Sequence, residues 1–274
     1  MFNYYWQERS FYHRSIAEIE QHIIEVNNIL TQADQYDHFF RYSKFDEFPY
    51  GKKSTIANLL FEQLTNEQLK RRIVPVIYKR FTSIDTSFVE ISQMNKNKMF
   101  SDKHNAFMGP LFYNTNNSMC YVVGLCSYQQ FRTEILKSTV NVNNLQIYSS
   151  IVSNHVILTS DAFAMLKSKG NCVKRLYEDI ISLEQYICDG NWNGVFNEYD
   201  ISKKTIMTIS DESDTVKANP KLQNSRKFYV PSKGKVCCFL HIKEGTFRFY
   251  LYPDEDIKKV YIVHITSHLP TKKY

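Results

Sequence analysis

The C-terminal part of the sequence predicts a succession of β-strands, which constrains the fold more than any other feature. Segments of β-branched and aromatic residues alternate with turn signals, which are Pro231-Ser-Lys-Gly, Glu244-Gly245 and Pro253-Asp-Glu-Asp. We therefore expect strands at 205–210, 226–230, 235–243, 246–252 and 258–266. Strands that follow each other along a chain commonly pair, so the pattern predicts an antiparallel β-meander.

Helices are predicted ahead of this meander. Helical segments are predicted in six places, and two further segments read as strands at 120–126 and 151–158. The predicted helices cover residues 11–31, 54–64, 65–76, 128–137, 160–169 and 172–188. Helices followed by a run of strands predict the α+β class. We expect an α/β N-terminal region of unknown role at 1–160 and an α+β basic domain at 161–274.

The sequence around Glu244 and Gly245 predicts a β-hairpin. With these two residues as the loop, Lys243 opposes Thr246 and His241 opposes Arg248. Alternation then places polar and aromatic side chains on one face, which is expected to face water: Phe239, His241, Lys243, Arg248 and Tyr250. The other face is apolar and is expected to pack on helices: Cys238, Leu240, Ile242, Phe247, Phe249 and Leu251.

Positive charge is concentrated in the same region. Residues 215–274 contain twelve Lys or Arg and four Asp or Glu, a net charge of +8, whereas residues 1–214 carry −2. Such asymmetry indicates a polyanionic partner. Cations neutralise phosphates, and exposed rings stack on unpaired bases. We therefore expect RNA or the ribosome as partner, contacted by Lys235, Phe239, Tyr250, Lys272 and Lys273.

The hairpin and the tail after it carry a resemblance to a known family. Residues 241–274 read HIKEGTFRFYLYPDEDIKKVYIVHITSHLPTKKY. Together with the helices before them, from about residue 160 on, they resemble the RelE-like superfamily of bacterial mRNA-cleaving toxins. The family's pattern has basic residues around the hairpin turn and after the last strand, with a Tyr nearby. The matching positions are Lys243, Arg248, His268 and Tyr274.

This resemblance implies a metal-independent endoribonuclease or a translation-targeting effector, in a toxin–antitoxin or phage-defence system. Cleavage by attack of the 2′-hydroxyl needs a base, a cation and an acid. His241 or Lys243 would be the base, Arg248 would stabilise the phosphorane, and His268 would be the acid. Tyr274 would stack or orient the substrate. An Arg is more usual where His268 stands, and residues 1–160 have no counterpart in the small toxins.

Other functions stay open at this point. The second hypothesis is a non-catalytic nucleic-acid-binding or complex-forming subunit, with an antitoxin or another protein as partner. A metal nuclease would use Asp211, Glu212 and Asp214, although acids in one short loop are not typical of such enzymes. A zinc site is disfavoured, since His264 and His268 offer the only loose ligand spacing. A hydrolase with partners distant in sequence also stays open.

The remaining features indicate no cofactor and no membrane. Glycine-rich nucleotide motifs are absent, and no apolar run approaches the length of a membrane span. The six Cys form no CxxC pair. They are interpreted as reduced thiols, and the start of the sequence lacks the pattern of a signal peptide. The expected compartment is therefore the cytoplasm.

Overall fold

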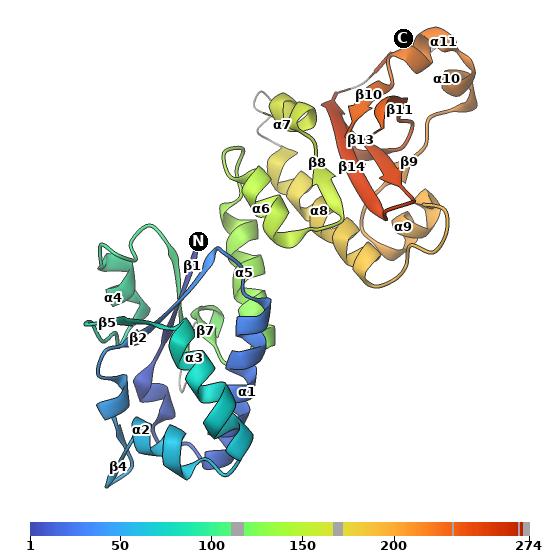
Figure 1. Ribbon diagram of the computed structural model, residues 1–274. Helices are drawn as coiled ribbons and strands as arrows, with labels where there is room; N and C mark the ends of the chain where they lie inside the picture. The colour runs from blue at the N-terminus through green and yellow to red at the C-terminus, as the bar shows by residue number, and fades with distance from the viewer. Residues whose placement is uncertain (111–117, 167–171, 232, 268, 271–274) are drawn as a thin grey trace. The chain divides into compact units, whose positions relative to one another are not determined.

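The computed structural model describes residues 1–110, 118–166, 172–231, 233–267 and 269–270. The chain divides into two compact units, Met1–Ile135 and Leu136–Tyr274, each with its own five-stranded sheet (Figure 1). The boundary expected near residue 160 differs from this division. The reason is that β8 (Val156–Leu158) pairs with the C-terminal strand β14 (Lys259–Thr266) and so belongs to the second sheet. Among the described residues, no helix has the length and apolar character needed to span a bilayer.

A parallel sheet forms the centre of the first unit. Its order is β5-β2-β1-β6-β7, and every neighbouring pair is parallel. The strands are β1 (Phe2–Trp6), β2 (Asp37–Tyr42), β5 (Thr82–Ile84), β6 (His104–Met108) and β7 (Tyr121–Val122). β1 is buried at every position. A strand covered on both faces shows no polar alternation, which explains why sequence reading did not predict β1 or β6.

Helices and short segments complete the first unit. The helix predicted at 11–31 is confirmed as α1 (Ile16–Gln32), which starts later because Ser15 and Glu18 form a capping box. The strand predicted at 120–126 is confirmed only over β7 (Tyr121–Val122), since α5 (Leu125–Thr139) already begins at Leu125. The other elements are η1 (Glu8–Phe11), η2 (Phe45–Glu47), β3 (Pro49–Tyr50), β4 (Ser54–Thr55), α2 (Ile56–Asn58), η3 (Leu59–Gln63), η4 (Leu69–Ile73), α3 (Val74–Arg80), α4 (Ile91–Lys96) and η5 (Ser118–Cys120).

The second unit contains an antiparallel-rich sheet in the order β8-β14-β13-β12-β9. Its strands besides β8 and β14 are β9 (Ile209–Ser210), β12 (His241–Glu244) and β13 (Phe247–Asp254). Only the β8–β14 pair is parallel. The predicted meander is therefore confirmed for β12, β13 and β14. The strand predicted at 235–243 is split, because β11 (Gly234–Cys237) leaves this sheet and pairs with β10 (Lys227–Val230).

Helices pack with the second sheet as the sequence indicated. The helix predicted at 172–188 is confirmed as α8 (Val173–Cys188), and its apolar residues Leu176, Ile180 and Leu183 are fully buried. The strand predicted at 151–158 begins only at Val156, because α6 occupies its first residues. The other helices are α6 (Leu145–Val152), α7 (Ser160–Leu166), α9 (Glu198–Lys204), α10 (Asp214–Ala218) and α11 (Pro220–Asn224).

Candidate nucleic-acid interface

The β10–β11 hairpin presents two lysines and a tyrosine on one face. Tyr229 pairs with Lys235 in the antiparallel register, and Lys227 lies two residues before Tyr229, so all three side chains share a face. All three are exposed, and Tyr229 keeps 56% of its surface accessible. Neither lysine forms an ion pair with the part of the chain that the structure describes. A cationic face with an accessible ring therefore results.

An open cleft of about 470 Å³ adjoins this face. It is lined by residues of α7, β10, β11 and β14: Asp161, Ala164, Met165, Lys227, Phe228, Tyr229, Lys235, Val263 and His264. The ring of His264 stacks on Phe228, with centroids 4.3 Å apart and planes 13° from parallel. The cleft thus combines two lysines, an imidazole and two aromatic rings, with Asp161 as its acidic residue.

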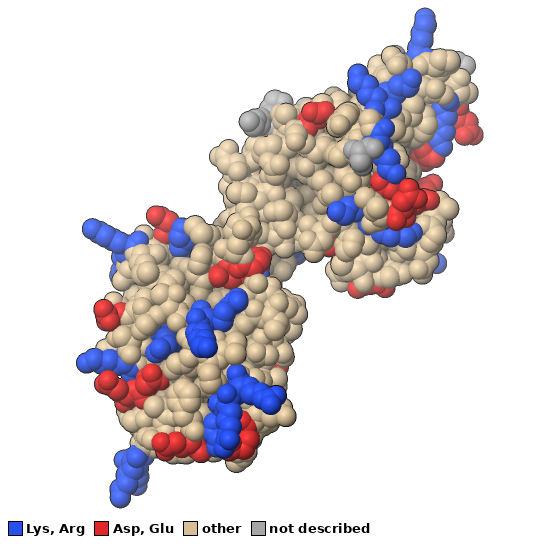
Figure 2. Space-filling model, in the orientation of Figure 1, with Lys and Arg blue, Asp and Glu red and all other residues tan. Residues whose placement is uncertain are grey.

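Lys and Arg side chains gather over β10 and β11 in the space-filling view (Figure 2). Part of the positive excess of residues 215–274 is neutralised locally. Lys217 pairs with Asp211, Arg226 with Glu212, and Lys233 with Asp254 and Asp256. Lys227 and Lys235 are not among these paired cations. The charges of Lys227 and Lys235 are therefore available to a partner at the cleft.

The register of the predicted hairpin differs from the expected one. Glu244 pairs with Phe247, so the loop consists of Gly245 and Thr246, and the opposed pairs are Lys243–Arg248 and His241–Tyr250. Gly245 has a φ of +54°. Loops of two residues need a positive φ at their first position, which favours Gly there. The expected pairs Lys243–Thr246 and His241–Arg248 are therefore wrong, although the same residues share a face.

The face of this hairpin that was expected to face water is largely covered. His241 and Tyr250 are 6% and 2% exposed, and Phe228 of β10 lies over Tyr250 with ring centroids 5.3 Å apart. Burial lowers the pKa of His241. Its Nδ1 lies 3.3 Å from the Phe239 carbonyl oxygen. The expectation that His241 and Tyr250 face water is therefore wrong. The opposite face is buried as expected at Ile242, Phe249 and Leu251.

The other predicted site residues are dispersed. The Arg248 guanidinium donates to the carbonyl oxygens of Gly245 and Phe247 at 3.0 and 2.7 Å, so it holds its own turn. Lys243 is exposed and Phe239 is half-buried. Among the predicted nucleic-acid contacts, Lys235 lies in the cleft. Four predicted residues lie outside the described part of the chain, namely His268, Lys272, Lys273 and Tyr274.

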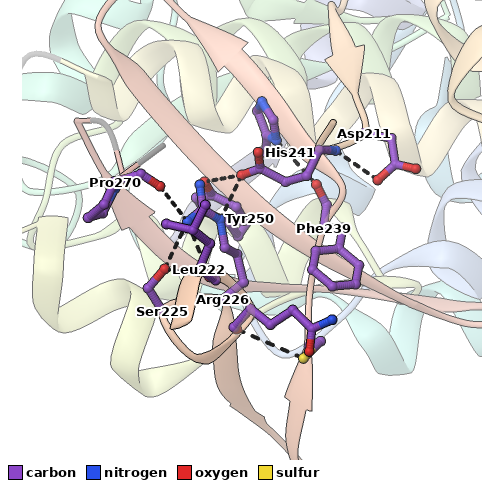
Figure 3. A network of polar contacts seen from close by, with 11 residues as sticks. Asp211, Leu222, Ser225, Arg226, Phe239, His241, Tyr250 and Pro270 are labelled. Carbon is purple, nitrogen blue, oxygen red and sulfur yellow. Dashed lines mark hydrogen bonds and ion pairs between the residues drawn. The ribbon is translucent and has the colours of Figure 1, made fainter. Parts of the chain in front are cut away.

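A buried polar network surrounds the Arg226 side chain (Figure 3). Arg226 is 1% exposed, and its Nε donates to Glu212 at 3.0 Å. Its guanidinium also donates to the oxygens of Ser225 and Pro270 at 2.8 and 2.7 Å. The Tyr250 hydroxyl donates to Glu212 at 2.9 Å. The network joins four segments of the second unit, and Arg226 and Tyr250 both donate to Glu212 Oε1.

The loop Asp211–Asp214 does not form a carboxylate cluster suited to Mg²⁺. Asp211 pairs with Lys217 and Glu212 with Arg226, while Asp214 begins α10. Carboxylates that already neutralise cations are poor ligands for a hard divalent ion. The arrangement therefore gives no support to the metal-nuclease hypothesis.

Sequence reasoning missed Lys227, Tyr229 and His264 as site residues. The turn signal at Pro231-Ser-Lys-Gly already indicated that the flanking segments pair. Alternation across that turn would have placed Lys227, Tyr229 and Lys235 on one face. Comparison of the chain with protein-family models, curated proteins and solved structures finds no match. The geometry of the cleft is therefore the basis for the proposed function.

Proposed function

We propose that the second unit binds single-stranded RNA in the cleft between α7, β10, β11 and β14. The observation that carries this proposal is the shared exposed face of Lys227, Tyr229 and Lys235 beside the cleft. Lysines neutralise backbone phosphates, and an exposed ring stacks on an unpaired base. Single strands offer both groups together, whereas the stacked bases of a duplex are not available to a side chain.

This binding would serve the effector that the resemblance of residues 160–274 to RelE-like toxins implies. In that setting the second unit would engage mRNA, alone or on the ribosome. The first unit would control or target it, in a toxin–antitoxin or phage-defence system. An antitoxin or another partner protein would then regulate access to the cleft. RNA binding is the step common to all these roles, so it is tested first.

We expect the double variant Lys227→Ala/Lys235→Ala to bind a labelled single-stranded RNA about tenfold more weakly. The slope of the logarithm of the binding constant against the logarithm of salt concentration should flatten by about 1.4, since each lost phosphate contact on a single strand removes about 0.7. Tyr229→Ala should weaken binding at all salt concentrations by about 1–3 kcal/mol without changing the slope. Fluorescence anisotropy across a salt series measures both quantities.

Two controls accompany this measurement. Lys52→Ala/Lys53→Ala removes the same charge from an exposed turn of the first unit and should leave the affinity unchanged. Asp161→Asn removes the acidic residue of the cleft and should strengthen binding. The proposal fails if the Lys52/Lys53 variant loses as much affinity as the cleft variant, or if the wild type binds no RNA.

Cleavage of the bound RNA is the second candidate function, and the position of His264 favours it. His264 lines the same cleft as Lys227 and Lys235. An imidazole can transfer a proton, and neighbouring ammonium groups can stabilise the charged phosphorane, without a metal ion. In this proposal His264 takes the acid–base role that the sequence indicated for His241.

RNA integrity after induced expression in a bacterial host tests this second function. Cleavage by the wild type should be lost in His264→Gln, which should still bind RNA. Arg248→Ala and Lys243→Ala serve as comparisons. If the site lay on the β12–β13 hairpin, both variants should lose cleavage, whereas a site in the cleft predicts near wild-type cleavage for both. Intact RNA with a folded, RNA-binding wild type would leave the non-catalytic subunit as the function of the cleft.

A further inference from the structure

Three side chains with different donor atoms meet at the end of α8. Glu184 and Cys188 are four residues apart in α8 and therefore lie on one face of the helix. His155 approaches them from the turn before β8. The Nδ1 atom of His155 lies 2.9 Å from Glu184 Oε1. Cys188 Sγ lies 3.6 Å from the same oxygen and 3.9 Å from His155 Nδ1.

These separations are close to the distances between donor atoms in a tetrahedral metal site. With bonds of about 2.3 Å to sulfur and about 2.0–2.2 Å to nitrogen or oxygen, a Zn²⁺ ion keeps sulfur about 3.5 Å from the other donors. Its nitrogen and oxygen donors lie about 3.4 Å apart in the same geometry. Each of the three separations is within about half an ångström of these distances, so small side-chain movements complete the site.

We propose that His155 Nδ1, Glu184 Oε1 and Cys188 Sγ bind one Zn²⁺ ion, with the fourth position open to solvent. Imidazole, carboxylate and thiolate are the three ligand types that Zn²⁺ takes in proteins. Cys188 is exposed and His155 is half-buried, so an ion can enter. Three protein ligands and one open position are typical of sites where the metal binds a further ligand.

The carboxylate is already held in position by neighbouring groups. Glu184 Oε2 accepts hydrogen bonds from the Ser153 hydroxyl at 2.6 Å and from the His155 backbone N–H at 3.0 Å. Its Oε1 accepts from the Asn154 backbone N–H at 3.1 Å. Such contacts orient metal ligands and lower the cost of assembling the site. Burial raises the pKa of Glu184, but these hydrogen bonds outweigh it and lower that pKa to about 2.

Metal binding at this site releases protons. The Cys188 thiol loses its proton to solvent and coordinates as a thiolate. The neutral imidazole of His155 coordinates through Nδ1 and carries its proton on Nε2. Affinity should therefore rise with pH. The hydrogen bonds of Glu184 already hold the turn before β8 without Cys188, so a purely structural cluster would not need the thiol.

Co²⁺ titration of the full-length chain tests the proposal, because Co²⁺ takes tetrahedral sites and its thiolate bond absorbs in the near ultraviolet. The wild type should bind one Co²⁺ per monomer with this thiolate band, and Zn²⁺ should displace the ion. Cys188→Ser should lose the band, and both Cys188→Ser and His155→Gln should bind Zn²⁺ at least about tenfold more weakly. Cys126→Ser, which removes another exposed thiol, should behave as the wild type.

Circular dichroism of each variant verifies that the fold persists. Absence of a thiolate band in the wild type would overturn the proposal. The same band in Cys188→Ser would also overturn it, and so would a stoichiometry of one ion for every two chains in a dimer. Either result would place the metal ion at another site. The measurement contains no RNA, so its outcome is independent of the RNA-binding proposal.

Discussion

Replacing Arg226 with methionine should destabilise the second unit by about 3–5 kcal/mol, the range expected when one partner of a buried ion pair is removed. The Arg226 side chain is 1% exposed and the Glu212 side chain 10% exposed. Methionine fills a similar volume but leaves the Glu212 carboxylate without its cation. It also leaves the carbonyl oxygen of Pro270 without the donor that lies 2.7 Å away.

Hydrogen exchange measures this loss, since amide protection can be followed separately in β13 and β14 of the second unit and in β1 and β6 of the first. The free energy of opening measured for amides in β13 and β14 should fall by about 3–5 kcal/mol, while that for amides in β1 and β6 should stay unchanged. The double variant Glu212→Gln/Arg226→Met should lose less than Arg226→Met alone, because no unpaired carboxylate remains.

Lys243→Met is the matched control for Arg226→Met. It makes a similar exchange of a cation for methionine, at an exposed position of β12 in the same unit. Its effect should stay within about 0.5 kcal/mol, as for ordinary surface substitutions. If Arg226→Met were as mild as Lys243→Met, the buried network would not contribute to the stability of the second unit.

Acidification from pH 7 to pH 4 should cost the first unit about 3 kcal/mol through His22 alone. His22 is 3% exposed. The Trp6 indole Nε1–H donates to its Nε2 at 3.0 Å, and its Nδ1 lies 3.4 Å from the Val123 carbonyl oxygen. These contacts select the neutral tautomer with the proton on Nδ1. A proton on Nε2 would place two N–H groups against each other.

The direction of the pH effect follows from the shifted pKa. Burial lowers the pKa of His22 from 6.5 to about 4, and the contact with Val123 opposes this only in part. Above pH 6.5 both the folded and the unfolded states are neutral at this residue. Between pH 6.5 and pH 4 only the unfolded state takes up the proton, so stability falls as the pH falls.

Urea unfolding of the Trp192→Phe variant at several pH values measures the effect, because Trp6 is then the sole indole and lies in the first unit. His22→Gln is the control. Its side-chain oxygen can accept from Trp6, and it does not titrate in this range. The advantage of the His22 protein over the His22→Gln protein should shrink by about 3 kcal/mol between pH 7 and pH 4. A stability difference between the two proteins that stayed constant from pH 7 to pH 4 would contradict the prediction. It would mean that the folded state takes up a proton at His22 as readily as the unfolded state.

Local patterns predicted the elements whose signals are contained in neighbouring residues. The helices α1 and α8 follow from apolar residues at helical spacing. The strands β12, β13 and β14 follow from alternation between turn signals. The central strand β1 left no such signal, because a strand buried on both faces shows no alternation. The hairpin loop lies one residue later than expected, which shifts the pairing by two residues, because the loop position depends on which residue takes a positive φ.

The sequence alone determined α8 and the strands β12, β13 and β14 of the second unit. It also determined which residues share a face of a hairpin and where positive charge is concentrated. These properties depend on neighbours within a few residues. Only the tertiary structure decided which face meets water. Phe228 of β10 lies over Tyr250 of β13, which becomes buried, while Lys227, Tyr229 and Lys235 remain exposed beside the cleft. Burial depends on segments that meet only after folding, and no local pattern in the chain records it.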